Sequence, residues 1–414
     1  MIKKVFKLKY CRLCKSKNII SVLDLGKTAL ANSFLNKKQL SDKELFFPLG
    51  LNFCPNCGQL QISHVVNPEL MFRNYVWVSS TSHVTREHFK EYAEMVFKKL
   101  DMKKGDLVVE MGSNDGVLLK PFKKMGAKVL GVDPARNVAK RATLEGINTL
   151  PYFFNSKIAK KISKKYGKAK VISGNNVFAH IHDLDEIVMG VKNLLEKDGV
   201  FVIEFPYLID FVEKNLFDLV YHEHLSYLAI APLAKFFKKH DMGIFDAVKT
   251  PVHGGSIRLF VQRVGGRYKT SESVGKYIKI EKQKKLDKLQ TYIKYANSIK
   301  NNKKDLMKIL KDLKTKKKKI VAFGAPAKGN TLLTYFNIDT KILDYIVDDS
   351  SYKHNLYTPG THIPIYSPDK LEVDKPDYIF MLAWNFADDL MKRLKEFKKS
   401  GGKFIIPVPK PHII

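Results

Sequence analysis

The chain has 414 residues, enough for two to four folded domains, and 45% of them are apolar and 27% charged, as in a soluble globular protein. These values exclude wholesale disorder, a collagen-like fibre and a small protein held together by disulfides. No apolar run approaches the ~18 residues of a membrane-spanning helix, and the basic start, residues 1–10, is too polar for a secretory signal. We therefore expect a cytoplasmic protein that does not contact a membrane.

The formal net charge of +31 raises the question of a nucleic-acid partner, because basic surfaces bind phosphate backbones. Only nine of the 72 basic residues are arginine, the side chain that best reads phosphates and base edges. The lysines are spread over the whole chain, which is typical of a solvated surface. We expect no nucleic-acid partner, and a small substrate that carries a nucleotide would also suit this charge.

The four cysteines form two Cys-x-x-Cys pairs near the N-terminus, Cys11 with Cys14 and Cys54 with Cys57. This spacing is typical of a four-cysteine zinc site, in which each pair presents two thiolates to one ion. The alternatives, disulfides or a redox pair, fit less well with a cytoplasmic protein whose cysteines lack a flanking βαβ pattern. Because the protein fills all four ligand positions, we expect the zinc to be structural.

Residues 107–204 alternate short apolar runs with amphipathic stretches, which predicts βαβ units around a parallel sheet. A buried strand at 107–110 ends in Glu110 and leads into a loop with Gly112 and Gly116, followed by a helix over about 117–125. The next strand, 129–132, ends in Asp133, where folds of this kind grip the ribose of a cofactor. Two further strands are predicted at 171–174 and 199–204.

The first loop distinguishes between two cofactors that share this arrangement. It reads E-x-G-S-N-D-G instead of the GxGxxG that a dinucleotide pyrophosphate requires. An acid and polar groups around the glycines suit the cationic sulfonium and amino-acid tail of S-adenosylmethionine better than two phosphates. The residues expected to bind S-adenosylmethionine are Glu110, Gly112, Ser113, Asn114, Asp115, Gly116, Asp133, Asn175 and Asn176.

Four polar or ionisable residues stand in a row at Tyr221, His222, Glu223 and His224. A metal site is one interpretation, but this sequence lacks the i, i+4 histidine spacing of a zinc helix. A solvated helix is another, although it does not favour such a density of polar groups. An acid–base centre is the interpretation we favour, because it needs a histidine and a carboxylate near one reacting atom.

Several motifs, taken in this order, resemble the sugar C-methyltransferases that act on nucleotide-activated keto-sugars. They are the two cysteine pairs and the segments 110–116, 175–180, 221–224, 253–256 and 324–329. The resemblance implies an α/β protein with three parts: an N-terminal zinc module, a central Rossmann-like class I methyltransferase domain and a C-terminal Rossmann-like domain. We place the zinc module at 1–75, the methyltransferase domain at 76–265, a helical connector at 266–318 and the C-terminal domain at 319–414.

The resemblance also implies roles for individual residues. It makes His224 the general base, with Tyr221, Glu223 and Tyr75 completing the catalytic site. The second aromatic residue after Asn74, often tyrosine in such enzymes, is Trp77 here, which puts a hydrogen bond assigned to that position in doubt.

Three further residues are candidates for substrate binding, and they are His180, His222 and Lys328. Lys328 stands in a glycine-containing loop between a strand at 319–323 and a helix from about 330, where backbone N–H groups favour an anion. Another strand is predicted at 342–347, and residues 269–317 at helical spacing predict one or two long helices. The resemblance places the nucleotide-sugar between the central and C-terminal domains.

The leading prediction is therefore a C-methyltransferase that uses S-adenosylmethionine, acts on a nucleoside-diphosphate-linked keto-deoxysugar, and works as a monomer or weak dimer. A base-generated enolate would attack the methyl group. An RNA or protein methyltransferase that docks through its zinc module is the second interpretation, suggested by the charge. The third is a non-catalytic scaffold that keeps the fold and the zinc module.

Overall fold

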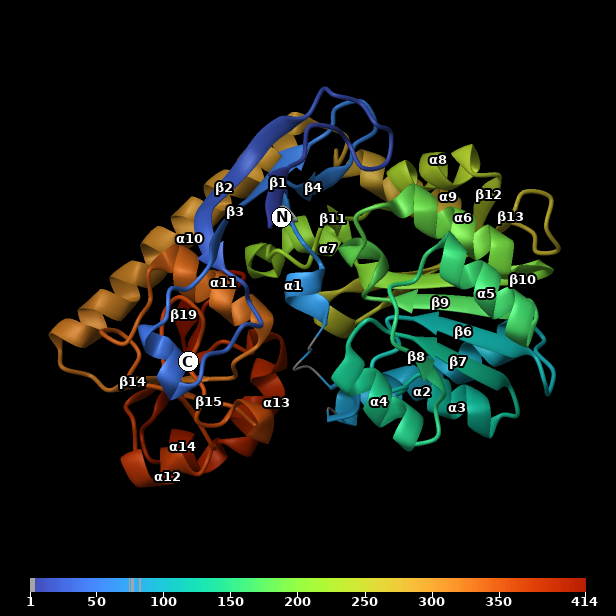
Figure 1. Ribbon diagram of the computed structural model, residues 1–414. Helices are drawn as coiled ribbons and strands as arrows, with labels where there is room; N and C mark the ends of the chain where they lie inside the picture. The colour runs from blue at the N-terminus through green and yellow to red at the C-terminus, as the bar shows by residue number, and fades with distance from the viewer. Residues whose placement is uncertain (1–3, 74, 76–77, 82) are drawn as a thin grey trace.

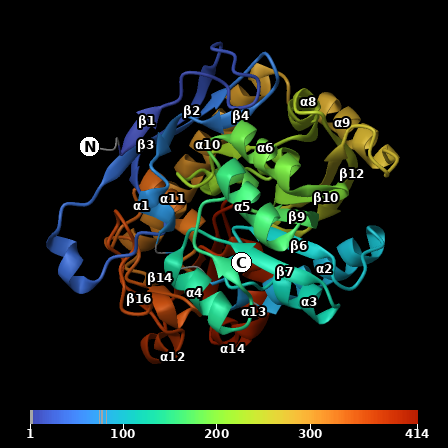
Figure 2. The same ribbon diagram turned by 45° about the vertical axis from the view of Figure 1, so that its right-hand side comes forward.

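A computed structural model describes residues 4–73, 75, 78–81 and 83–414 of the chain. Three regions are visible in Figure 1. The N-terminal strands lie at the upper left, the central α/β domain lies on the right, and the C-terminal domain lies at the lower left. The long helix α10 (Leu289–Thr315) runs along the N-terminal strands β2 (Ile20–Ala29) and β3 (Phe46–Phe53) towards the C-terminal domain (Figure 1 and Figure 2).

The central sheet has seven strands in the order β12-β13-β10-β9-β6-β7-β8. The strands from β8 to β10 are parallel, whereas β13 is antiparallel to both of its neighbours. The chain leaves β6 to build one side of the sheet and returns at β9 to build the other, so the strand order reverses between them. In open α/β sheets, ligands bind in the crevice at the carboxyl ends of such a pair of strands. The strands are β6 (Leu107–Met111), β7 (Lys128–Val132), β8 (Thr149–Leu150), β9 (Ala169–Asn175), β10 (Leu195–Pro206), β12 (Met242–Thr250) and β13 (Ser256–Arg263).

Helices cover both faces of this sheet, because successive side chains of a strand point to opposite faces. Val108 packs with Phe122 in one apolar cluster, and Val109 packs with Ile162 in another. In Figure 1, α2, α3 and α4 lie below the sheet, and α5, α6 and α8 lie above it. The helices are α2 (His83–Lys99), α3 (Leu119–Lys124), α4 (Arg136–Leu144), α5 (Ser156–Tyr166), α6 (Leu184–Leu194), α7 (Leu208–Glu213), α8 (Ile230–Lys239) and α9 (Glu272–Gln283).

The N-terminal module is a four-stranded sheet in the order β11-β4-β3-β2, with a separate antiparallel pair formed by β1 and β5. Its edge strand β11 comes from the segment that follows His224, so the sheet joins two parts of the chain that lie far apart in sequence. The remaining elements are β1 (Val5–Lys7), β4 (Leu60–Ile62), β5 (His64–Val66), β11 (Ser226–Tyr227) and the short helix α1 (Glu69–Phe72).

The C-terminal domain has a six-stranded sheet in the order β16-β15-β14-β17-β18-β19, parallel except for the last strand. Helix α11 begins directly after Pro326, close to the predicted start near residue 330. The elements are β14 (Ile320–Phe323), α11 (Ala327–Phe336), β15 (Ile346–Val347), β16 (Ile365–Tyr366), α12 (Lys370–Asp374), β17 (Tyr378–Met381), α13 (Ala387–Arg393), α14 (Lys395–Lys399), β18 (Lys403–Ile406) and β19 (His412–Ile413).

The predicted α/β class, with an N-terminal four-cysteine module and a Rossmann-like C-terminal domain, is confirmed. The strand predicted at 342–347 is shorter, because the amides of Ile342 and Leu343 donate to the Asp339 carbonyl in a turn. Among the helices of the described residues, none is both long enough and apolar enough to cross a bilayer.

Candidate functional site

The two cysteine pairs converge at one end of the N-terminal module. The Sγ atoms of Cys11 and Cys57 are 3.5 Å apart, those of Cys14 and Cys54 are 3.6 Å apart, and all four lie within 4.8 Å of one another. Four sulfurs around one tetrahedral Zn²⁺, with Zn–S bonds of ~2.3 Å, are ~3.8 Å apart. The four thiols therefore fit a structural zinc ion, which would cross-link the two pairs. Gly58, with φ of +85°, makes the tight turn after the second pair.

The loop after β6 lies at the crevice of the central sheet, as the sequence predicts. Gly112 has φ of +65°, and a Cβ atom there would lie 2.2 Å from the Val177 side chain. Gly116 has φ of +76° and would meet Ile147 at 2.9 Å in the same way. Both glycines are therefore required by backbone conformation and by close packing within the protein, independently of any ligand.

Buried polar atoms around this loop lack partners within the described part of the chain. They are Ser113 Oγ, Asp115 Oδ1 and Asn175 Oδ1. Burial also raises the pKa of Glu110 well above its ordinary range, because a buried carboxylate is costly without a cation or a hydroxyl beside it. Orphaned acceptors and a buried acid suit the ribose hydroxyls and the positive charge of S-adenosylmethionine, so these residues fit that cofactor.

The other predicted cofactor residues have partners in the protein. The Asp133 carboxylate accepts hydrogen bonds from the amides of Asn114 and Ala135, each at 2.8 Å, and burial raises its pKa. The Asn114 side-chain oxygen accepts from the amide of Ser79 at 2.9 Å. The segment before α2 is thus bonded to the cofactor loop. The amide of Asn176 donates to the Glu204 carbonyl at 2.7 Å, which holds the ends of β9 and β10 together.

His224 is held at both ring nitrogens. Its Nδ1 lies 2.8 Å from the Leu219 carbonyl, which can only accept, so this nitrogen carries the proton. Its Nε2 lies 2.8 Å from the Tyr221 hydroxyl. With Nδ1 protonated, Nε2 accepts the phenolic proton and is the basic nitrogen of the neutral ring. The carbonyl therefore fixes the tautomer that a general base requires.

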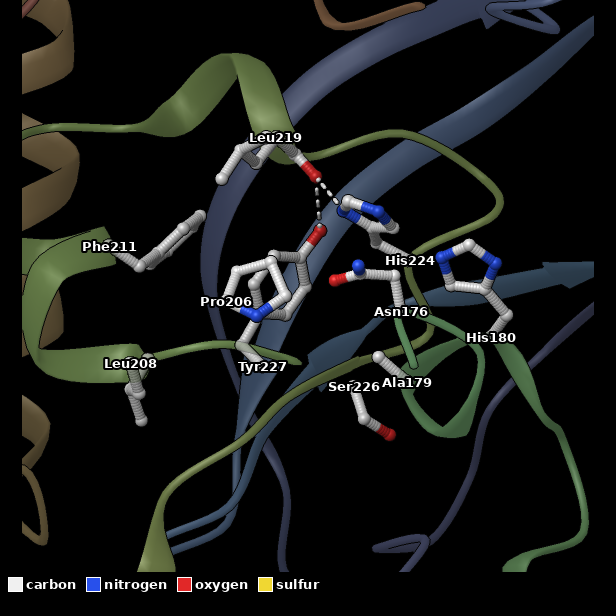
Figure 3. A pocket seen from close by; sticks show the side chains of 10 residues that line it. All are labelled: Asn176, Ala179, His180, Pro206, Leu208, Phe211, Leu219, His224, Ser226 and Tyr227. Atoms are coloured by element: carbon white, nitrogen blue, oxygen red, sulfur yellow. Dashed lines mark hydrogen bonds between the residues drawn. The ribbon is translucent and has the colours of Figure 1, made fainter. Parts of the chain in front are cut away.

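His224 lines a pocket at the carboxyl edge of the central sheet, shown in Figure 3. His180 stands beside it, with the two ring centroids 4.9 Å apart. Asn176 and Tyr227 contribute polar groups, and Tyr227 donates its hydroxyl to the same Leu219 carbonyl at 3.3 Å. The remaining lining residues are Ala179, Pro206, Leu208, Phe211, Leu219 and Ser226.

Glu223 faces a second pocket, towards the N-terminal module. Its carboxylate accepts a hydrogen bond from the Asn32 side chain at 2.6 Å and another from the Tyr75 hydroxyl at 2.9 Å. Three residues from different parts of the chain therefore meet here, and Leu30, Ser33, Leu70 and Met71 complete the pocket wall. Burial raises the pKa of Glu223 to about 7, and the two hydrogen bonds oppose this rise.

The raised pKa makes the stability contribution of Glu223 depend on pH. The ordinary pKa of glutamate is 4.5. Between 4.5 and about 7, the folded protein keeps a proton that the unfolded chain releases, so this group lowers the free energy of unfolding by ~1.4 kcal/mol per pH unit as pH rises. Glu223→Gln lacks this titration. We expect the stability of Glu223→Gln relative to wild type to increase across this range and then level off.

Urea unfolding of both proteins over a series of pH values measures this difference. The matched variant Asn32→Ala removes one donor to the carboxylate, so it should extend the range to higher pH. A difference between Glu223→Gln and wild type that stays constant with pH would contradict the expectation.

Two of the residues predicted to bind substrate, Lys328 and His222, lie outside both pockets and in different surroundings. Lys328 is partly buried, with Nζ 2.7 Å from Asn385 Oδ1, 4.0 Å from Asp218 Oδ2 and 3.5 Å from the centre of the Trp384 ring. His222 points away from both pockets, and its Nε2 lies 3.3 Å from the Pro48 carbonyl. Trp77 lies outside the described residues.

Three residues of this site were not predicted from the sequence. One is Asn32, the partner of Glu223. Helix α11 supplies the other two: Thr331 donates to the Val220 carbonyl at 3.1 Å, and Asn330 donates to the Ala31 carbonyl at 2.6 Å. They hold the segments that carry Tyr221 and Asn32. The only local sequence signal for Asn330 and Thr331 was their position directly after the glycine-containing loop of residues 324–329.

Three family models match the chain. A proposed zinc-binding domain matches residues 11–72, a methyltransferase domain matches 81–243, and a C-methyltransferase C-terminal domain matches 251–409. The first range contains all four cysteines, which confirms the predicted zinc module.

Individual proteins are also similar. The C-methyltransferase NovU of Streptomyces niveus is 32% identical over 404 residues, covering 98% of this chain and 96% of NovU. A ubiquinone biosynthesis O-methyltransferase of Bartonella quintana is 26% identical over 157 residues, covering 34% of this chain and 62% of that protein. Part of the fold is similar to the crystal structure of magnesium protoporphyrin IX methyltransferase from Synechocystis PCC 6803. The similarity covers 44% of this chain and 81% of that protein, with 15% sequence identity and a TM-score of 0.33. The similarity to NovU extends over all three regions of the fold.

Proposed function

Because the chain belongs to the C-methyltransferase family that carries an N-terminal zinc-binding module, we propose that it methylates a carbon atom of a keto-deoxysugar linked to a nucleoside diphosphate. S-adenosylmethionine is the methyl donor and binds at the crevice lined by Glu110, Asp115 and Asn175. The zinc ion is structural. The observation that carries the proposal is the fixed tautomer of His224, which leaves a basic Nε2 on a side chain that lines the pocket beside His180 and Asn176.

His224 generates the carbon nucleophile. Its Nε2 takes a proton from the carbon next to the sugar ketone, and the electron pair of the broken C–H bond moves to form an enolate. The Tyr221 hydroxyl, which donates to Nε2 in the structure, moves to the ketone oxygen and stabilises its negative charge. Bound S-adenosylmethionine supplies the electrophilic methyl group that this carbon accepts. Glu223 and Tyr75 orient the sugar from the second pocket.

Lys328 contacts the diphosphate. It lies at the N-terminal end of α11, its charge faces the buried Asp218, and burial lowers its pKa to about 8. We expect Lys328→Met to raise KM for the nucleotide-sugar by roughly tenfold with little change in kcat, the loss of one charge-assisted hydrogen bond. In wild type, KM should rise as pH passes about 8 and the ammonium group loses its proton, whereas the variant should lack this rise.

Lys303→Met is the matched control for Lys328. The Lys303 ammonium group also lies over an aromatic ring, 4.5 Å from the centre of Tyr335, but on the connector helix α10. Unchanged KM in the control and raised KM in Lys328→Met would support the assignment. Equal KM values in both variants and wild type would contradict it.

The proposal is tested by incubating the protein with labelled S-adenosylmethionine and a panel of nucleoside-diphosphate-linked 4-keto sugars. The expected result is label in a sugar that gains the mass of one CH₂ on carbon. Label in RNA or in a protein substrate would support the second interpretation instead. No binding of S-adenosylmethionine in a calorimetric titration would support a non-catalytic scaffold.

A further inference from the structure

Arg12 stands inside the first zinc-binding pair, between Cys11 and Cys14, and its side chain is directed into the protein. It is 1% exposed, the largest of the fully buried side chains described. Arginine is rarely buried to this extent without a carboxylate partner. The described residues give this guanidinium no ion pair with a carboxylate, and Asp183 contributes only a longer-range charge attraction.

The Arg12 guanidinium instead binds two segments of the central domain. Its Nε donates to Ser226 Oγ at 3.1 Å. One terminal nitrogen donates to His182 Nδ1 at 3.3 Å, and the other donates to the Ile181 carbonyl. Burial and the nearby charge of Arg12 lower the pKa of His182 to about 4, so this imidazole is neutral and can accept. A planar fork with several donors suits three acceptors in different directions.

These two segments carry the paired histidines of the pocket. Ile181 directly follows His180, and Ser226 comes two residues after His224. The segments are also joined by the Leu225 amide, which donates to the Ala179 carbonyl at 2.9 Å. Arg12, which does not itself line the pocket, thus bridges the two segments through the Ser226 side chain and the Ile181 carbonyl.

A zinc ion bound by the four thiols would fix the position of Arg12. Its neighbour Cys11 is one of the four thiols that converge, and its own amide donates to Gln61 Oε1 at 2.8 Å. Gln61 lies opposite Ser226 in the pairing of β4 with β11. Four thiolates around one Zn²⁺ would carry two net negative charges, and this charge beside Arg12 would offset the cost of burying its cation.

We infer that Arg12 is a positioning residue, which couples the zinc-binding pair of the N-terminal module to the two histidine-bearing segments of the pocket. The effect of Arg12 on kcat rests on the proposed function, whereas its effect on hydrogen exchange at the Leu225 amide does not. The experiment therefore reads both.

Arg12→Met, Arg12→Lys and wild type are compared, with Arg263→Met as the matched control. Arg263 also donates to backbone carbonyls, those of Lys192 and Leu195, but at the other end of the central sheet. We expect Arg12→Met to keep one equivalent of zinc and to exchange the Leu225 amide hydrogen at least about tenfold faster by mass spectrometry. We expect kcat to fall about tenfold or more, with KM within a factor of about three.

Arg12→Lys keeps the charge and the alkyl stem, so it folds even if Arg12→Met does not. Its single nitrogen can bind only one of the two segments at a time, so its Leu225 amide should exchange at a rate between those of wild type and Arg12→Met. Faster exchange and lower kcat in both variants, with neither change in Arg263→Met, would support the inference. Wild-type exchange in Arg12→Lys, or a loss of thermal stability without faster exchange at Leu225, would overturn it. The exchange result decides the inference even if wild type methylates no keto sugar.

Discussion

His224→Asn is expected to lower kcat for methylation by ~10²–10⁴-fold, the usual contribution of a general base. Asparagine keeps a polar side chain of similar size near the Leu219 carbonyl, but it has no basic nitrogen at the place of Nε2. The binding of S-adenosylmethionine should be unchanged, because the cofactor crevice lies at the ends of β6 and β9. Steady-state kinetics and calorimetric titration measure the two quantities.

The control is His240→Asn. His240 is a largely buried histidine at the end of α8 that lines neither pocket, and its Nε2 bonds Asp185 at 2.8 Å. This variant should keep kcat close to that of wild type. Near-normal kcat in His224→Asn, with cofactor binding intact, would mean that another group removes the proton.

Removal of zinc is expected to unfold the N-terminal module. Metal binding contributes on the order of 10 kcal/mol to the folding of small zinc modules, and this module supplies both β4 and the site residue Asn32. The four cysteines are the only ones in the chain, so a thiol reagent reports on the metal site alone. We expect all four thiols to be protected in the purified protein and to become reactive when a chelator removes one equivalent of zinc.

A loss of the far-ultraviolet signal of the module and of methylation should accompany the release, and added zinc should restore both. Asn56→Ala is the control, because the exposed Asn56 only donates to Cys14 Sγ at 3.4 Å, and we expect it to retain zinc. Free reaction of the thiols in protein that contains zinc would contradict the assigned ligands.

The cofactor crevice was predictable because its signals are local. A buried strand that ends in an acid, a glycine-containing loop and a helix follow one another within residues 107–125, and each depends on neighbours in sequence. The same holds for the two cysteine pairs, whose spacing alone dictates how each pair can turn towards a metal. The sequence does not reveal why residue 112 must be glycine; the structure shows that the Val177 side chain approaches too closely for a Cβ atom.

The assembly of the two pockets around residues 221–224 depends on tertiary packing. Arg12 contacts Ser226 and Asn32 contacts Glu223, on either side of His224, where this segment joins the N-terminal module through the pairing of β11 with β4. Thr331 reaches this segment because α11 packs against the turn at Val220. His222, in contrast, is close to the site in sequence, but its side chain lines neither pocket. It lies between two site residues in sequence, yet its side chain turns to the other side of the chain and meets the Pro48 carbonyl.

Removal of a carbon-bound hydrogen by His224 is the central claim, and hydrogen exchange into the substrate tests it without methyl transfer. The protein is incubated in deuterium oxide with a nucleoside-diphosphate-linked 4-keto sugar that wild type methylates, in the absence of S-adenosylmethionine. We expect wild type to introduce deuterium at the carbon next to the ketone and His224→Asn to introduce none above the uncatalysed rate. Deuterium entering as fast with His224→Asn as with wild type would contradict the account.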